Sequence, residues 1–153
     1  PDIIDFIKKM KKMGFLVKLD SNGTRPDVLK RIFDQKLVDY VAMDIKSSLE
    51  NYDKTTGSKV DKDRIRLSVN LIRNSKVPYE FRTTVVPGLH EEKDFLEIAK
   101  WISGAQAYYL QEYREEQKIL DPDLKKVTKG KKIDLDKIKK IIEKNFEKIE
   151  IRR

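Results

Sequence analysis

The sequence predicts an α/β protein in which a parallel sheet is flanked by helices. Short apolar runs of strand length alternate with longer segments whose apolar residues recur at helical spacing. Because strands and helices alternate, the connections are expected to be right-handed crossovers between parallel strands. The chain of 153 residues is long enough for one hydrophobic core. Four such strands fit half of a barrel or a small open sheet, and the pattern does not choose between them.

The first third of the chain predicts two helices and two strands. Apolar residues recur at helical spacing over 3–13, and a strand is predicted over 15–20. Thr24 is expected to cap a second helix that has Pro26 in its first turn. The apolar run 38–45 is too short for a typical helix and therefore predicts another strand.

The rest of the chain continues the alternation after an aperiodic stretch, 47–60, which predicts a loop. The periodicity and the turn residues predict helices over 61–74, 91–102 and 135–146, strands over 79–86 and 106–111, and a short terminal strand over 149–151. We expect two parts, an α/β part over 1–114 and a second part over 115–153 that holds a basic linker, a helix and a strand.

Charged side chains stand at the ends of two predicted strands. Asp20 ends the first, whereas Asp44 and Lys46 are two residues apart at the end of the second. Side chains alternate along a strand, so Asp44 and Lys46 should share a side if the extended geometry continues. Ligands bind beyond the carboxyl ends of parallel strands. We therefore expect Asp20 and Asp44 to be neighbours at a ligand site.

The composition excludes several kinds of site. The chain has no cysteine, which excludes disulfides, thiolate zinc sites and an iron–sulfur cluster ligated by this chain alone. His90 is the only histidine, so a transition-metal site is not expected, and we interpret His90 as a residue at the start of a helix. The sequence shows no secretory signal and no apolar run long enough to span a bilayer, so we expect a cytoplasmic protein.

The net charge of +8 is concentrated near the C-terminal end. From Arg114 onward there are 14 Lys or Arg against 9 Asp or Glu. This surplus leaves open a noncatalytic basic α/β module that binds nucleic acid or a protein partner. The lysine-rich stretch 125–132 is more often a solvated segment, so nucleic-acid binding is the less favoured reading.

Four stretches of the sequence resemble the glycyl-radical activating enzymes of the radical S-adenosylmethionine (SAM) type. They occur in that family's order and spacing: Leu-Asp-Ser-Asn-Gly-Thr at 19–24, Tyr-Val-Ala-Met-Asp-Ile-Lys at 40–46, Phe-Arg-Thr-Thr-Val-Val-Pro-Gly at 81–88 and Tyr-Leu-Gln-Glu-Tyr at 109–113. The likeness is greatest to anaerobic ribonucleoside-triphosphate reductase activating proteins, with pyruvate formate-lyase activating enzymes next. It extends from residue 1 to about residue 114.

The resemblance implies the second half of a partial (β/α) barrel. In that family, a 4Fe-4S cluster held by three cysteines cleaves SAM reductively, and the resulting radical abstracts hydrogen from a glycine of a partner enzyme. Flavodoxin or ferredoxin would donate the electron. The cysteine loop and the Gly-Gly-Glu-Pro stretch of the family are missing, so we expect an inactive C-terminal fragment. A fragment with exposed apolar surface is also expected to self-associate.

The resemblance also implies cofactor-binding residues. Lys46 matches a position suited to the methionine carboxylate of SAM, and Asp20 and Asp44 match positions suited to its ammonium, its ribose or a monovalent cation. The further matches are Asn22 and Arg82, together with Arg114, which stands where the family has a histidine near the adenosine. No catalytic residue or metal ligand is expected in this chain.

Simpler readings of these residues stay open. Asp44 and Lys46 also fit a strand-end ion pair, which would contribute little to stability if exposed. Asp20 fits a turn that ends a strand, and Arg82 fits a side chain that extends its guanidinium to the surface.

Overall fold

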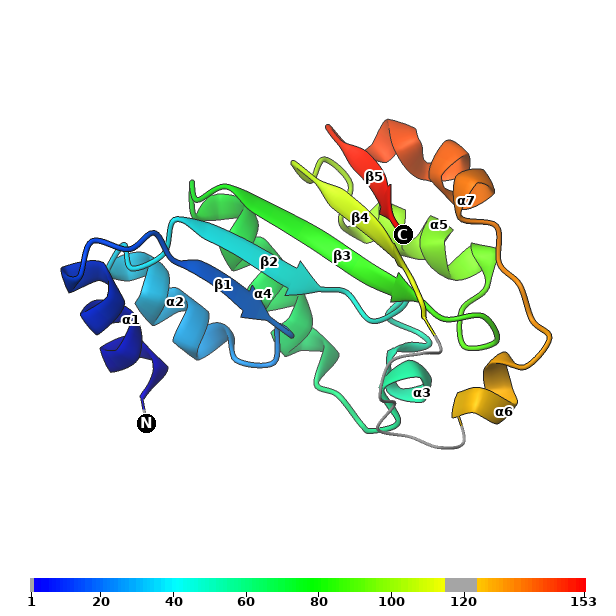
Figure 1. Cartoon of the computed structure of the whole chain (residues 1–153), viewed down its shortest axis with the longest axis horizontal. Coiled ribbons are helices and arrows are strands. Elements are labelled where there is room, and N and C mark those ends of the chain that lie inside the picture. The colour runs from blue at the N-terminus through cyan, green and yellow to red at the C-terminus, as the bar shows by residue number, and fades with distance from the viewer. Residues whose placement is uncertain (1, 115–123) are drawn as a thin grey trace. The chain divides into compact units, whose positions relative to one another are not determined.

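The computed structural model describes residues 2–114 and 124–153 (Figure 1). The described strands form a parallel sheet in the order β1-β2-β3-β4-β5, which confirms the predicted α/β class. The strands are β1 (Lys18–Ser21), β2 (Tyr40–Asp44), β3 (Tyr79–Val85), β4 (Tyr108–Glu112) and β5 (Ile149–Arg152).

Helices follow most of the strands, as the alternation predicted. They are α1 (Ile3–Lys12), α2 (Pro26–Asp34), α3 (Tyr52–Thr56), α4 (Lys62–Asn74), α5 (Glu92–Trp101), α6 (Leu124–Thr128), α7 (Leu135–Ile142) and the 3-10 helix η1 (Glu143–Asn145). The stretch predicted as a loop, 47–60, thus contains a short helix. The first strand begins three residues later than predicted, because Phe15 and Leu16 are exposed and precede the ladder.

The described residues group into two compact units. The first contains residues 2–44 and 61–81, and the second contains 45–60, 82–114 and 124–153. Strand β3 contributes its first residues to one unit and its last residues to the other. The expected division at residue 114 stays a prediction, and most of the expected linker, 115–123, lies outside the described residues.

The first unit has its core between β2 and the helices α2 and α4, which contact each other. Val41, Ala42 and Met43 are all fully buried. Burial of consecutive strand residues means that both faces of β2 are covered, as in a parallel sheet. The helices contribute Leu29, Ile32, Ile65 and Ile72 to this core.

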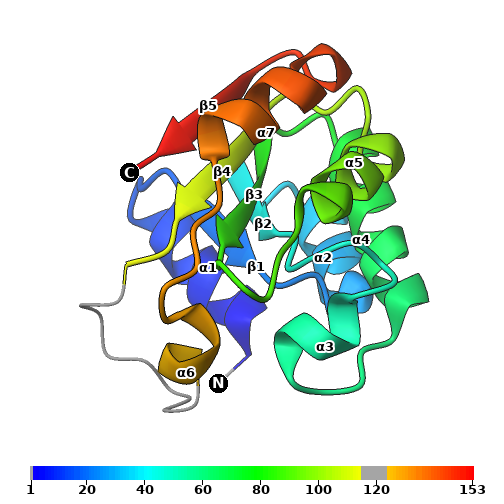
Figure 2. The same ribbon diagram turned by 90° about the vertical axis from the view of Figure 1, so that its right-hand side faces the viewer.

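The second unit is built around β4 and β5, which pair in parallel from Tyr108 opposite Ile149 onward. Helix α7 contacts both of these strands and also α5 (Figures 1 and 2). The predicted last helix ends as an α-helix at Ile142 and continues as η1 to Asn145. The core residues of the second unit include Phe95, Ile98, Tyr108, Leu110, Ile138 and Ile142.

Two glycines of the first unit allow a matched test of packing at the end of β1. Gly23 (φ +76°) and Gly14 (φ +85°) both adopt the left-handed backbone region. A Cβ at Gly23 would lie 2.1 Å from Cε of the fully buried Met43, whereas a Cβ at Gly14 meets nothing within 4 Å. Gly14→Ala should lower the free energy of unfolding by about 1 kcal/mol through backbone strain alone.

We expect Gly23→Ala to cost about 1 to 2 kcal/mol more than Gly14→Ala, because Met43 has to be displaced within a packed core. Urea unfolding of the two variants measures the difference. Equal losses of stability would mean that Met43 moves aside without strain.

Candidate functional site

The carboxylates of Asp20 and Asp44 lie where β1 and β2 end. Asp20 is opposite Ala42 in the parallel ladder, and Ala42 and Asp44 are two residues apart on β2. Paired residues of neighbouring strands point to the same side, as do residues two apart on one strand. The register therefore places Asp20 and Asp44 on one face of the sheet, at the edge where both strands end.

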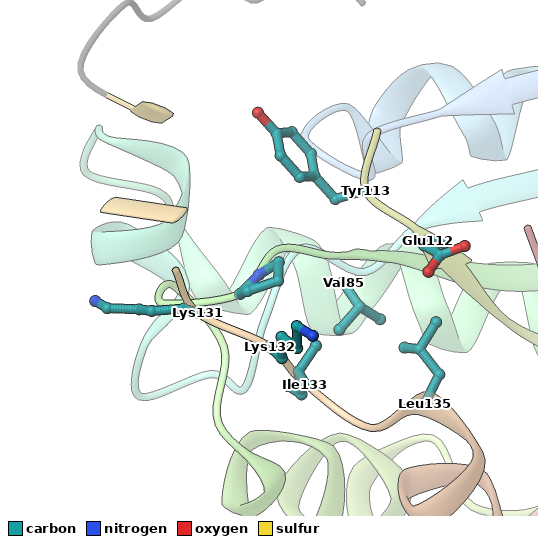
Figure 3. Close-up of a pocket in the computed structure, with 8 residues that line it drawn as sticks. Val85, Glu112, Tyr113, Lys131, Lys132, Ile133 and Leu135 are labelled. Carbon is teal, nitrogen blue, oxygen red and sulfur yellow. The ribbon is translucent and has the colours of Figure 1, made fainter. Parts of the chain in front are cut away.

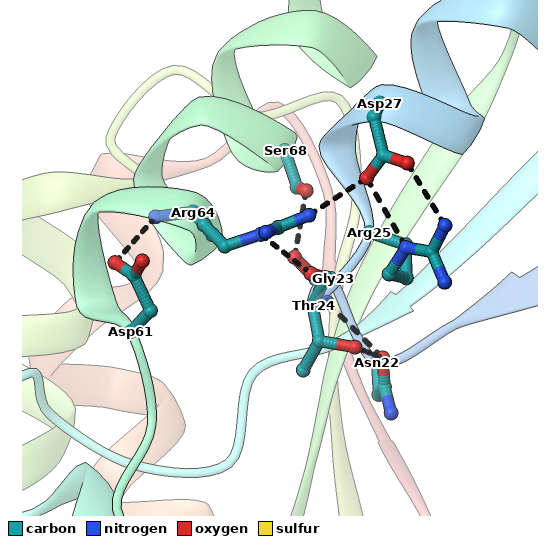
Figure 4. Close-up of polar contacts among 8 residues, drawn as sticks. All are labelled: Asn22, Gly23, Thr24, Arg25, Asp27, Asp61, Arg64 and Ser68. Atoms are coloured by element: carbon teal, nitrogen blue, oxygen red, sulfur yellow. Dashed lines mark hydrogen bonds and ion pairs between the residues drawn. The ribbon is translucent and has the colours of Figure 1, made fainter.

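Asn22 lies in the turn that follows β1 (Figure 4). Its side-chain Oδ1 accepts hydrogen bonds from the backbone N–H and the hydroxyl of Thr24, at 3.1 and 2.8 Å. The expected cap by Thr24 is wrong: the N-cap residue is Arg25, and Pro26 begins α2. Thr24 lies outside the helix because its hydroxyl is bound to Asn22.

Helix α4 holds this turn from the other side (Figure 4). The Ser68 hydroxyl donates to the Gly23 carbonyl at 2.7 Å, and Arg64 Nε donates to the Thr24 carbonyl at 3.0 Å. The guanidinium of Arg64 also binds the carboxylate of Asp27 at 2.7 Å. The backbone of the turn that carries Asn22 is therefore fixed by side chains of a helix forty or more residues away in the sequence.

Ile45 and Lys46 follow β2 in the sequence and are the first residues of the second unit. Ile45 N–H donates to the Arg82 carbonyl at 2.8 Å, which continues the pairing with β3. The Ile45 carbonyl accepts from the Thr83 hydroxyl at 2.6 Å, and Thr83 in turn accepts from the Tyr108 hydroxyl at 2.7 Å. The Tyr108 phenol is a protonated donor at neutral pH, and burial raises its pKa further above the ordinary value.

Both backbone groups of Lys46 are bound by buried side chains. Its N–H points to the Tyr52 hydroxyl, 3.4 Å away, and its carbonyl lies 2.8 Å from His90 Nε2. Nδ1 of the same ring lies 3.0 Å from the Val86 N–H and 3.3 Å from the Val86 carbonyl. The shorter contact needs Nδ1 as an acceptor, and in that tautomer Nε2 carries the ring proton and donates it to the Lys46 carbonyl.

Asp94 anchors the residues that follow Lys46. One of its carboxylate oxygens accepts from the Ser48 hydroxyl at 2.5 Å and from the Asn51 side-chain amide at 2.7 Å. The other accepts from the Glu91 N–H at 2.9 Å, which forms a capping box at the start of α5. Burial would raise the pKa of Asp94, but these hydrogen bonds outweigh it, and the pKa lies below the ordinary value.

The two arginines among the predicted site residues lie in the second unit. Arg82 is half-buried within β3, and its carbonyl pairs with Ile45, the neighbour of Lys46. Arg114 is exposed, two residues beyond the end of β4. Of the six predicted residues, the structure thus groups Asp20 with Asp44 and places Asn22 in the turn after Asp20, and it sets Lys46 beside the backbone of Arg82.

A pocket of about 320 Å³ opens beyond the ends of β3 and β4 (Figure 3). Its walls combine apolar side chains with a carboxylate and two amines: Val85, Pro87, Glu112, Tyr113, Lys131, Lys132, Ile133 and Leu135. The lysine-rich stretch therefore forms part of a wall, which the sequence did not predict, because its charge pattern alone is that of a solvated segment.

Gly88 allows the lysine-rich stretch to approach this pocket. Its φ is +88°, and a Cβ there would lie 2.5 Å from the Val127 carbonyl oxygen and 2.8 Å from Lys131 Cδ. Both contacts are closer than real Cβ atoms allow. The turn after β3 therefore needs a residue without a side chain.

Within residues 2–114 and 124–153, no cluster of three His, Cys, Asp or Glu side chains could hold a metal ion. No helix of the described chain has both the length and the apolar composition needed to cross a membrane.

The profile of the Radical SAM superfamily matches residues 1–102. The chain belongs to this superfamily. It is 32% identical over 154 residues to a protein of Methanocaldococcus jannaschii named "Putative glycyl-radical enzyme activating enzyme". That alignment covers 98% of the chain and 64% of the relative. The radical SAM resemblance predicted from the four sequence stretches is thus confirmed.

A solved structure has the same fold. A domain of the pyruvate-formate lyase-activating enzyme from Bacteroides vulgatus superposes with a TM-score of 0.71 at 15% identity, covering 99% of this chain and 89% of that domain. The predicted α/β partial barrel is therefore confirmed at the level of fold.

The radical SAM family implies SAM and a 4Fe-4S cluster, and the residues present fit only one of them. Asp20 and Asp44, which end neighbouring strands of the first unit, offer carboxylates of the kind that bind the ammonium group of an amino acid such as the methionine end of SAM. The cluster does not fit, because this chain has no thiolate to ligate iron.

Asp94 should make the free energy of unfolding decrease as the pH falls in the acid range. Because its pKa is lower in the folded state than in the unfolded state, its contribution is complete above the ordinary pKa of aspartate, about 3.9, and is lost as pH falls through the folded value. Asp94→Asn should lower the free energy of unfolding at pH 7 by about 1 to 3 kcal/mol and flatten its acid dependence.

Urea unfolding between pH 2 and 7 measures both effects. Glu97→Gln is the matched control, because Glu97 lies on the same helix in an exposed pair with Lys100 and should change stability little. An unchanged acid slope in Asp94→Asn would show that Asp94 has no depressed pKa in the folded protein.

Proposed function

We propose that this chain is the part of a glycyl-radical activating enzyme that binds the methionine end of SAM. The observation that carries the proposal is the placement of Asp20 and Asp44 on one face of the sheet where β1 and β2 end. Lys46 follows Asp44 by two residues in the sequence, and both of its backbone groups are bound. Carboxyl ends of parallel strands are the usual ligand positions of such sheets. The superfamily match and the name of the relative support this function.

Each predicted site residue has a role in this proposal. Lys46 binds the methionine carboxylate of SAM, and Asp20 and Asp44 bind its ammonium group, its ribose or a monovalent cation. Arg82, whose carbonyl pairs with Ile45 next to Lys46, is a further candidate contact for SAM. For the remaining two residues we propose further polar contacts to SAM: Asn22 lies in the turn after β1, and Arg114 follows the end of β4.

The work of these residues is placement. When bound, the cofactor with its cluster supplies a carbon radical that removes hydrogen from a glycine of the partner protein. The residues of this chain would hold the cofactor in one orientation, because a reactive group must lie within contact distance of the bond that it attacks.

The complete reaction needs components that this chain lacks. The chain spans 64% of the length of its archaeal relative. We propose that cysteines elsewhere in the same protein hold the 4Fe-4S cluster, so that this chain alone is inactive. The partner is a glycyl-radical enzyme, with anaerobic ribonucleotide reductase as the first candidate, and flavodoxin or ferredoxin supplies the electron. The enzyme would act in the cytoplasm without oxygen.

Exposed apolar side chains of the first unit support the proposal that the isolated chain self-associates. Phe6, Met13, Phe15 and Leu16 are each more than half exposed, and β1 is an edge strand of the described sheet. Unpaired edges and apolar patches favour association with a second copy.

The rival function is that of a noncatalytic basic module. The segment 124–133 carries five lysines and no acidic residue, which is the observation that favours nucleic acid. Affinity for a duplex oligonucleotide that is at least micromolar and falls steeply with salt would support this module. Its absence, together with SAM binding, would support the activating enzyme.

Light scattering tests the self-association. The isolated chain should show a weight-average mass that rises with protein concentration, and Phe6→Lys with Leu16→Lys should restore a monomer because the substitutions place charge on the apolar surface. The exchange Leu67→Lys is the control, since Leu67 is also exposed but lies on α4. A monomeric wild-type chain at all concentrations would contradict the proposal.

Substitutions at the strand ends test the SAM site. In the holoenzyme that contains this chain, Asp44→Asn and Lys46→Met should each raise the Kd for SAM about tenfold or more, because each removes one charge-assisted contact. Isothermal titration calorimetry gives the Kd. Lys30→Met is the control, because Lys30 pairs with Asp34 on the exposed side of α2 and should not alter binding. Unchanged affinity in both strand-end variants would contradict the assignment.

A further inference from the structure

We infer that His90 is a positioning residue for Lys46, which it fixes through the backbone of the lysine rather than through its side chain. This inference rests on the role proposed for Lys46 in binding SAM. It assigns a function to the only histidine of the chain, which the sequence alone indicated to be a residue at the start of a helix.

The first step is the position of Lys46 itself. It lies two residues beyond the last residue of β2, where the ladder of the sheet no longer pairs every backbone group. Its N–H meets the Tyr52 hydroxyl at 3.4 Å, and its carbonyl accepts from His90 Nε2 at 2.8 Å. Tyr52 is 1% exposed and His90 is 4% exposed. The peptide of Lys46 is thus held at both ends by groups shielded from water.

The second step is that His90 is itself fixed. The ring atom Nδ1 accepts from the Val86 N–H at 3.0 Å, and the backbone N–H of His90 donates to the Val86 carbonyl at 3.0 Å. Its ring packs against Phe95 with the ring centroids 5.7 Å apart. A rotation of the imidazole would therefore break bonds on both sides of the ring. The position of the donor Nε2 is set by the turn between β3 and α5.

The third step is that Tyr52 and the intervening residues are fixed to the same helix. Asp94 of α5 binds Ser48 and Asn51, which lie between Lys46 and Tyr52. The Asn51 N–H also points to the Ser48 hydroxyl at 3.4 Å. The two residues that bind the Lys46 backbone, Tyr52 and His90, are thus both connected to the start of α5: Tyr52 through its neighbour Asn51, which Asp94 binds, and His90 by lying four residues before Asp94.

The consequence concerns binding entropy. A lysine side chain is long and flexible, and ordering it on a ligand carries an entropic cost. If the backbone from which the side chain extends were also mobile, the cost would be larger. Because the Lys46 backbone is already fixed, binding of the methionine carboxylate carries no further entropic cost for ordering that backbone.

The experiment is a double-mutant cycle in the holoenzyme, with SAM affinity from calorimetry as the readout. His90→Phe retains a ring of similar volume and removes both hydrogen bonds. We expect it to raise the Kd for SAM about fivefold. His90→Gln retains a donor near the Lys46 carbonyl and should recover part of this loss. In the Lys46→Met background, His90→Phe should have no further effect.

A second arm covers the case in which His90→Phe fails to fold. Tyr52→Phe removes only the hydroxyl that faces the Lys46 N–H, and the same cycle with Lys46→Met should again show coupling. Urea unfolding of every variant separates lost stability from lost affinity, because a general loss of packing weakens SAM binding equally with and without Lys46.

The outcomes distinguish the two proposals. If Lys46→Met weakens binding and His90→Phe does not, or if their effects on the Kd simply multiply, the positioning role of His90 is overturned while the SAM site stands. If Lys46→Met binds SAM as tightly as the wild type, the role proposed for Lys46 fails and the inference fails with it. Coupling in the cycle together with recovery in His90→Gln supports the positioning role.

Discussion

The structure of the second unit depends on how the backbone beyond β2 finds its hydrogen bonds. Buried N–H and C=O groups need partners, and the ladder of a sheet supplies them only as far as its strands extend. At Ile45 and Lys46 the missing partners come from Arg82, Thr83, Tyr52 and His90. Because these partners belong to three different segments, the path of the chain after β2 is determined by the folding of residues up to forty-four positions away.

Charge stabilises the same region through Asp94. A buried carboxylate is costly unless its oxygens are hydrogen-bonded. Here three donors satisfy the carboxylate: two come from the segment after β2, and one is the N–H of Glu91, the N-cap residue of the helix that contains Asp94. The Asp94 side chain thus caps the start of α5 and also binds the segment that follows β2. The backbone of Lys46 is therefore held in place although Lys46 does not belong to a regular strand.

The sequence predicted the parts of this fold that depend on local pattern. The apolar run around Val41 predicted a buried strand, and Asp20 and Asp44 were expected at neighbouring strand ends, where the register places them. It misplaced the start of β1, because Phe15 and Leu16 have strand-like side chains but no strand partner. It also missed α3 and the contacts of His90, since the bond to Lys46 joins residues far apart in the sequence and leaves no local signal.

Gly88 determines where the lysine-rich segment lies, because it has no side chain that would hold this segment away from the turn after β3. The turn after β3 can accommodate the carbonyl of Val127 and the stem of Lys131 only because nothing projects from Cα at that position. A larger residue there would push the basic segment outward and change the part of the pocket wall that Lys131 and Lys132 form. Relatives that differ at this one position would therefore present a different electrostatic face to any molecule approaching the ends of β3 and β4, even with every lysine unchanged.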